Sequence, residues 1–369
     1  MLLHPFVHAF TRSAPLCLAL AALPTTAMAQ ATTRVVPPGF ADIEGNLLSN
    51  SLFGRLQSGV QFLCDPRVVA SAPGLVLDVS FRVKGDANSY PAYTKQYKLT
   101  VAQTSVTAAA MTRDPVANHA GATPTVVFQM PLNVPASSPV TVLPKPFSIT
   151  LPFNAPFAYD PAQGGLLLTA TTDDAITPPG TYRLDAASTR NDRADGIVAS
   201  LMPGCSAGGA AMTLAADATQ LHFGGALAAT LTSNSPGSFP LAAFLLGFTR
   251  QNVDLSALGM AGCTLNTDIA ASLSVLETGG SYPPVNLAIP GTPSLEGAAL
   301  FAQVLGVTAT PGTLAGSVTS NLLGLRIGNP TGHSVWAQSM FTLNLASTQW
   351  SIGGVGTFMP VLQLGGILP

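Results

Sequence analysis

Hydrophobic and polar residues alternate over several short stretches in the first half of the chain, a pattern typical of strands with one buried face. The clearest stretch is 75–83, where every second residue from Leu75 to Val83 is apolar. Stretches of this kind, separated by turn-forming residues, occupy 75–83, 96–102, 125–130, 147–153, 166–171, 181–186 and 196–202. No helical pattern of about 12 residues lies between them, so they predict antiparallel β-structure.

The run Leu166–Leu168 is continuously apolar, and we expect it at the centre of a sheet, covered on both faces. The segment "PFAYDPAQGG" precedes it. Pro156 and Pro161 lack the amide hydrogen that a central strand donates, so neither fits such a strand. We expect Asp160 to cap its own turn and the two following glycines to permit positive φ. The segment therefore predicts a turn that sets where the buried strand begins.

The second half of the chain repeats the pattern of short apolar segments after a glycine-rich stretch, "PGCSAGG". A final part contains both tryptophans and predicts two or three strands that either extend a sheet or form an exposed hairpin. The predicted fold is all-β, with two tandem antiparallel β-sandwich domains of jelly-roll or immunoglobulin-like type. The predicted divisions are a signal peptide at 1–29, an N-terminal sandwich at 30–203, a C-terminal sandwich at 204–328 and a β-rich tail at 329–369.

The N-terminus has the pattern of a secretory signal peptide. Basic residues precede the apolar run "APLCLALAALP", and Ala27 and Ala29 occupy the small-residue positions of a cleavage site. A membrane anchor needs about 20 apolar residues, whereas Pro15 and Pro24 bound this run closely. No later segment is long and apolar enough to predict a transmembrane helix. We expect a cleaved leader and a secreted or cell-surface protein.

Three cysteines remain after the predicted cleavage, namely Cys64, Cys205 and Cys263. An oxidising compartment permits a disulfide, and three thiols allow three single bridges with one thiol left over. The pair Cys205 and Cys263 is favoured because both lie in the predicted second domain. Cys64 is then expected as a buried free thiol.

Charge is scarce along the chain. Asp, Glu, Lys and Arg make up 9% of 369 residues, and the net charge is -2. An average globular protein has about 25% charged residues. So small and balanced a charge does not favour a nucleic-acid partner. The surface is expected to consist largely of Ser, Thr, Asn, Gln and exposed apolar atoms.

Several segments together resemble a group of secreted two-domain β-sandwich proteins of environmental bacteria. In the first half the segments are "LVLDVSFRV" and "FSITLPFNAPFAYDPAQGGLLLTAT", which carries the PFxYDPAxGxLLL motif. In the second half they are "FLLGFTRQNVDLSALGMAGCTLNT", "LAIPGTPSLEGAALFAQVLGV" and "SNLLGLRIG". The resemblance spans roughly residues 40–328 and implies fold and secretion, without an activity. Gly165 and Ala170 stand where the group often has more polar or acidic residues, which weakens the hypothesis of a metal site at the turn.

The segment "GCSAG" formally matches the nucleophile elbow of serine hydrolases, with Ser206 as the nucleophile. His333 follows it in the chain, and Asp254 or Asp268 lies between them. An elbow requires a strand before the serine and a helix after it, whereas β segments flank this one and Cys205 is the favoured disulfide partner. We therefore predict no catalytic residues, and a secreted serine hydrolase is a remote alternative.

Metal and cofactor sites are not predicted. The three histidines after the leader have no metal-ligand spacing. The polar cluster Asp185–Gly196 resembles a calcium loop superficially, but Arg193 stands where an oxygen ligand belongs. We interpret it as a solvated loop in which Arg183, Arg190 and Arg193 pair with Asp185, Asp192 and Asp195. A weak calcium site formed by Asp160, Asp173 and Asp174 remains a secondary hypothesis.

Carbohydrate contact requires aromatic platforms with polar neighbours. Tyr90, Tyr93 and Trp336 are the candidates for ligand contact, although tyrosines at such spacing more often pack in a sheet with the hydroxyl at its rim. The first functional hypothesis is a secreted, non-enzymatic surface, matrix or adhesion protein. The alternative is an extracellular carbohydrate-binding protein, and an extracellular glycan or a surface or matrix component is the expected partner of either.

Overall fold

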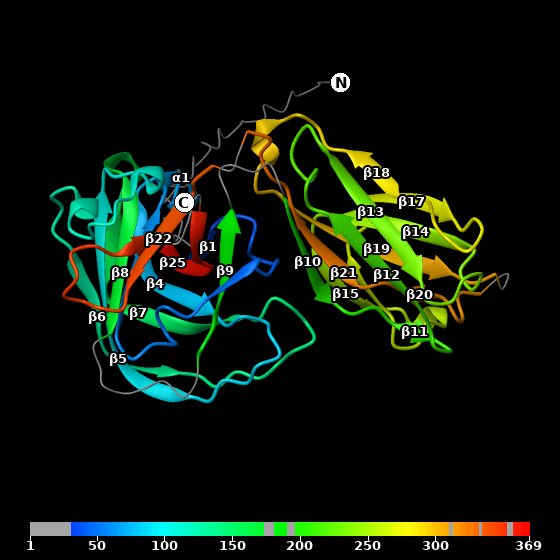
Figure 1. Ribbon diagram of the computed structural model, residues 1–369, viewed down its shortest axis with the longest axis horizontal. Coiled ribbons are helices and arrows are strands. Elements are labelled where there is room, and N and C mark those ends of the chain that lie inside the picture. Colours follow the sequence, from blue (N-terminus) through cyan, green and yellow to red (C-terminus); the bar gives the residue numbers. More distant parts are fainter. Residues whose placement is uncertain (1–30, 173–180, 190–195, 310–312, 332–333, 353–356) are drawn as a thin grey trace, which may run out of the picture. The chain divides into compact units, whose positions relative to one another are not determined.

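The computed structural model describes residues 31–172, 181–189, 196–309, 313–331, 334–352 and 357–369. Antiparallel strands make up about half of these residues (Figure 1), and helical structure is limited to short turns such as α1 (Pro66–Val69). The predicted all-β class is confirmed. The predicted signal peptide, 1–29, lies outside the described residues.

Three sheets surround a first hydrophobic core. In spatial order, the first contains β1 (Thr32–Val36), β25 (Leu362–Ile367), β4 (Gly74–Arg82) and β7 (Phe147–Tyr159). The second contains β23 (Ser351–Ile352), β22 (Ala337–Thr342), β3 (Ser58–Cys64), β8 (Gly165–Thr172), β5 (Tyr93–Thr104) and β6 (Thr125–Val134). The third contains β2 (Leu47–Ser49), β9 (Leu184–Thr189) and β24 (Thr357–Pro360). The core between them includes Phe62, Phe81 and Leu168, all buried.

A second hydrophobic core lies among strands from the latter half of the chain. One sheet has the order β10 (Ile197–Met202), β21 (Leu322–Arg326), β19 (Ala299–Val307), β14 (Leu241–Gly247) and β17 (Ala271–Leu276), and β20 (Val318–Thr319) also pairs with β19. Another has the order β11 (Ser206–Ala207), β12 (Ala210–Asp217), β13 (Ala226–Ser233) and β18 (Val285–Ala288). A separate hairpin pairs β15 (Arg250–Asp254) with β16 (Thr264–Thr267).

The segment before the leucine run behaves largely as predicted. Pro156 lies in β7, at the edge of its sheet, where the pairing with β4 shifts register. The Asp160 side chain accepts a hydrogen bond from the amide of Ala162 and so caps the short turn Pro161–Gln163. Only Gly164 has a positive φ, at 115°. A side chain there would also collide with the Thr104 carbonyl, so glycine is required. The chain then enters β8, which lies between β3 and β5 with its leucines fully buried, as expected.

Two of the predicted divisions do not follow the strand pairing. β10 precedes the predicted division at residue 203, yet it pairs with β21 along its whole length. The predicted tail also joins sheets that begin the chain: β22 pairs with β3, β24 with β9, and β25 with both β1 and β4. In Figure 1 the red strand β25 therefore lies beside the blue strands β1 and β4. The tail extends existing sheets and is not an exposed hairpin.

The interpretation of Asp185 as part of a solvated loop is wrong. Asp185 lies in β9, is fully buried and accepts a 2.7 Å hydrogen bond from Nε of Arg82, itself 0% exposed. The amide of Gly45 also donates to this carboxylate, and Lys84 lies 3.5 Å from it. Arg183 pairs with Asp86 instead. Residues 190–195, which the interpretation also included, lie outside the described residues.

Arg82 is satisfied by more than one partner, as a buried guanidinium must be. Its Nη1 and Nη2 donate to the carbonyls of Ala41 and Ile43, and its Cζ lies 5.1 Å from the centre of the Phe147 ring. Because β4 and β9 belong to different sheets, this single ion pair joins two sheets and the loop that contains Ile43.

We predict that Asp185→Ala lowers the free energy of unfolding by about 3–5 kcal/mol, because it leaves the Arg82 charge buried without a counter-charge. Urea denaturation followed by tryptophan fluorescence measures the change. Arg183→Ala is the matched control, since it removes a partly exposed ion pair and should cost less than about 1 kcal/mol. Equal losses in the two variants would contradict the structural role of the buried pair.

Candidate functional site

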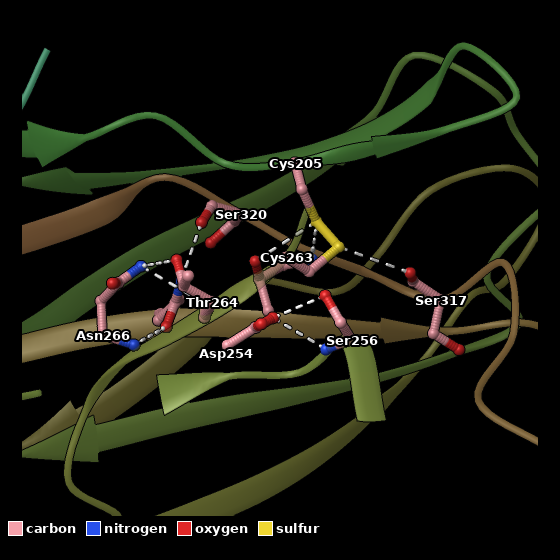
Figure 2. Close-up of a disulfide and its surroundings, with 10 residues drawn as sticks. Cys205, Asp254, Ser256, Cys263, Thr264, Asn266, Ser317 and Ser320 are labelled. Carbon is pink, nitrogen blue, oxygen red and sulfur yellow. Dashed lines mark hydrogen bonds between the residues drawn. A yellow bond between two sulfur atoms is a disulfide. The ribbon is translucent and has the colours of Figure 1, made fainter. Parts of the chain in front are cut away.

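The predicted disulfide between Cys205 and Cys263 is present, and it closes a loop of 58 residues (Figure 2). It joins the residue before β11 to the residue before β16. Cys64 is the remaining free cysteine of the described chain, and it is fully buried in β3. Burial raises the pKa of this thiol to about 12, so the reactive thiolate is absent at neutral pH.

Buried polar side chains form a hydrogen-bond network next to the disulfide. Gln303 accepts a hydrogen bond from the amide of Asn266 and donates to the carbonyls of Thr264 and Ser320. Thr264, Asn266 and Ser320 lie together beside the disulfide in Figure 2. The network holds β16 against β19. It makes the part of the β19 sheet next to the disulfide rigid.

An open groove of about 660 Å³ begins at Cys205 and runs along β12. We call it the edge groove. Its residues come from β10, the β11–β12 hairpin and β21: Val198, Ser200, Gly204, Cys205, Ser206, Ala211, Met212, Thr213, Leu214, Ala215, Ala216, Asn321 and Leu323. None of them carries a charge.

On the outer edge of β12, the Asn321 side chain bonds the backbone groups that a neighbouring strand would otherwise pair with. β11 pairs only with Ala210 and Ala211, and beyond them no strand of the described chain covers this edge. At Leu214 the Asn321 amide donates to the carbonyl at 3.0 Å and accepts from the N–H at 2.8 Å. Backbone groups point alternately to the two sides of a strand, so those of Met212 and Ala216 face the same way as Leu214.

The opposite end of the larger sheet also exposes an edge. β17 pairs with β14 on one side, and the described residues supply no strand on its other side. Three apolar side chains are strongly exposed on or next to it: Ile269, Leu273 and Leu276, at 56%, 44% and 64%. The segment 269–276 contains no charged residue or proline, which are the usual protections of an edge strand.

Ser206 does not lie on a nucleophile elbow. It is exposed in β11, and the turn that follows leads through Gly208 and Gly209 directly into β12, with no helix. Asp254 accepts hydrogen bonds from Ser256, and Asp268 accepts them from the amides of Phe248 and Thr249. His333 lies outside the described residues. Within the described residues, no hydrogen bond links Ser206 to a histidine or either aspartate.

The two candidate tyrosines pack within the first core. Tyr90 is 5% exposed, and its hydroxyl donates to Asp86 while its ring lies 4.9 Å from that of Tyr182. Burial and this carboxylate raise the pKa of Tyr90. The Tyr93 hydroxyl donates to the carbonyl of Phe53. Both hydroxyls are therefore satisfied within the protein, as expected for tyrosines in a sheet.

Trp336, the third candidate, lines a different pocket of about 530 Å³, which we call the Trp336 pocket. Its walls come from β1, the loop after it, α1, β7 and β25: Thr33, Arg34, Val35, Pro38, Gly39, Ala41, Asp42, Arg67, Val68, Phe147, Trp336 and Gln363. Neither candidate tyrosine lines it. Sequence reasoning identified Trp336 alone, because its neighbours come from segments far apart in the chain.

The orientation of Trp336 is fixed by its neighbours. Its carbonyl accepts a 2.8 Å hydrogen bond from the amide of Asp65, and the Arg67 guanidinium lies 5.3 Å from the ring centre. Asp65 holds that guanidinium through Nε and Nη2, at 2.8 and 2.9 Å. The pocket thus presents an indole and a cation in a defined arrangement.

The described residues contain no group of three or more His, Cys, Asp or Glu side chains that could hold a metal ion. Of the secondary calcium hypothesis, Asp173 and Asp174 lie outside these residues. The Asp160 carboxylate already accepts hydrogen bonds from Ala162 and Gln163. In the part of the chain that the structure describes, no helix is long and apolar enough to cross a membrane.

No known protein family, curated protein or solved structure matches this chain.

We predict that replacing both Cys205 and Cys263 with alanine lowers the free energy of unfolding by about 4 kcal/mol, because the unfolded chain loses the constraint of a 58-residue loop. Chemical denaturation of the double variant and the parent measures the difference. The parent beginning at Gln30, which lacks Cys17, should react with a thiol reagent only after unfolding, at Cys64 alone. Rapid reaction of the native parent would show that the disulfide is absent or that Cys64 is accessible.

Proposed function

We propose that this chain is a secreted, non-enzymatic protein of two β-sandwich domains that assembles on the cell surface or in an extracellular matrix. The observation that carries the proposal is the uncovered edge of β12 beside the uncharged edge groove. An exposed strand edge recruits another strand through main-chain hydrogen bonds, which is a general mode of protein association.

The partner that fits this edge best is β17 of a second copy. The residues that line the edge groove and the whole of β17 are uncharged, so pairing there desolvates no ionic group among them; Asp217, at the end of β12, lies outside the groove lining. Leu273 is 44% exposed on β17 and supplies an apolar side chain to such an interface. Because the two edges are at different places on the same molecule, such pairing is head-to-tail and produces rings or open chains of molecules.

Asn321 regulates this pairing in the proposed assembly. Its amide occupies the Leu214 backbone groups that an incoming strand would use. The incoming strand therefore has to displace the amide or pair only at Met212 and Ala216. This raises the concentration at which assembly begins and protects the protein from premature association.

Among the described residues, no histidine or aspartate forms the hydrogen bond with Ser206 that would activate its hydroxyl as a nucleophile. The alternative function, binding of an extracellular carbohydrate, is supported by a different observation, the Trp336 pocket. There an indole, a phenyl ring and several polar side chains line one cavity. The two functions use separate surfaces, and they are compatible in one adhesive protein.

We predict that the protein beginning at Gln30 associates in a concentration-dependent way, and that Leu273→Lys reduces this association at least about tenfold, because it places a charge at the pairing edge. Analytical ultracentrifugation over a range of concentrations measures the effect. Asn321→Ala, which frees the Leu214 backbone groups, should strengthen association.

Leu343→Lys is the matched control, because Leu343 is 48% exposed and lies outside both edges. It should leave association unchanged. A protein that stays monomeric at all concentrations, or one that Leu273→Lys and Leu343→Lys weaken equally, would overturn assembly through β17.

A further inference from the structure

The Trp336 pocket concentrates charge in a chain that has little. Three of its twelve lining residues, Arg34, Asp42 and Arg67, are charged, against 9% of the whole sequence. Phe147 and Trp336 add two aromatic rings to the same cavity. Aromatic rings with a few polar groups around them are typical of sites that bind small ligands.

The two arginines of this pocket differ in their partners. Arg67 is held by Asp65, so its charge is largely neutralised. Arg34 is exposed on β1, and within the described residues it forms no ion pair. A guanidinium presents paired N–H donors that match the two oxygens of a carboxylate. Arg34 is therefore available for an anionic group of a ligand.

A third arginine lies behind the wall of the pocket. Arg326 is fully buried, and its Nε donates to the carbonyl of Pro38, which lines the pocket. Its Nη1 and Nη2 have no hydrogen-bond partner within the described chain. Gly39 is tightly packed here, since a side chain would meet both the carbonyl of Gly297 and the Arg326 guanidinium.

The acidic groups near the pocket are engaged by a cation or by hydrogen bonds, except for Asp42. Asp65 is paired with Arg67. Glu296 accepts hydrogen bonds from Asn329 and from the amide and hydroxyl of Ser334. Although burial opposes it, these bonds keep the pKa of Glu296 below its usual range, so its charge balances part of the buried arginine charge. Asp42 is the remaining acid of the pocket, and no ion pair engages it within the described residues.

We propose that the Trp336 pocket binds a carboxylated sugar unit of an acidic extracellular polysaccharide, with the sugar ring against the aromatic side chains and its carboxylate on Arg34. The proposal rests on the carbohydrate-binding alternative above and specifies its ligand. Asp42 and Gln363 provide an acceptor and an amide for the sugar hydroxyls. A neutral sugar would leave the Arg34 guanidinium without its charged partner.

Calorimetric titration of the protein beginning at Gln30 with galacturonate trisaccharide tests the proposal. The galactose trisaccharide of the same linkage, in which hydroxymethyl groups replace the carboxylates, is the matched ligand. We expect the acidic ligand to bind at least about tenfold more tightly, and the difference to shrink as salt is raised. Arg34→Gln should remove the preference without changing the affinity for the neutral ligand.

Arg55→Gln is the control, because Arg55 is an exposed arginine that does not line the pocket, and it should change neither affinity. Trp336→Phe, which keeps an aromatic ring, should weaken both ligands while thermal unfolding verifies that the variant is folded. Equal binding of the two trisaccharides, or an unchanged preference in Arg34→Gln, would overturn the acidic ligand and leave carbohydrate binding intact. Absence of binding by either trisaccharide would overturn both.

Discussion

The buried ion pair between Arg82 and Asp185 is the constraint on which the first core depends. Taking two charges out of water costs several kcal/mol each, so the pair is tolerable only where further hydrogen bonds satisfy it. The carbonyls of Ala41 and Ile43 and the amide of Gly45 meet that requirement. The loop they belong to must consequently keep one conformation. Moving that loop would leave both buried charges without these hydrogen bonds.

The C-terminal strands depend on the same pair. β25 pairs with β4, which carries Arg82, and β24 pairs with β9, which carries Asp185. Between these strands the amide of Val361 donates to the carbonyl of Asp185. The last part of the chain is thus fastened to both sheets at the point where the ion pair joins them. The first core is complete only when residues separated by about the whole length of the chain meet, so its contacts are largely non-local.

The sequence predicted those elements whose signal is local, and missed those whose signal is not. Alternation identified β4 and the leucine run identified β8, because one strand contains the whole pattern. β3 was missed: it is buried at all seven positions, so its polar Gln61 and Ser58 hide the apolar character. Asp185 was misread because nearby arginines suggested partners, whereas its true partner lies 103 residues earlier. Trp336 was likewise predicted from the sequence, whereas its contact with Arg67 was not, because the two residues are far apart in the chain.

The burial of several charged side chains also affects how the protein surface can recognise a partner. Arg82, Asp185 and Arg326 are wholly buried, so part of a small supply of charge does not reach solvent. The remaining surface has little long-range field to attract or repel a partner. Recognition must then rely on short-range contacts: open backbone groups at strand edges, exposed leucines, and the few charged side chains gathered around Trp336. On such a surface one added or removed charge is a larger fraction of the total local charge than on an average protein, so specificity can rest on single residues.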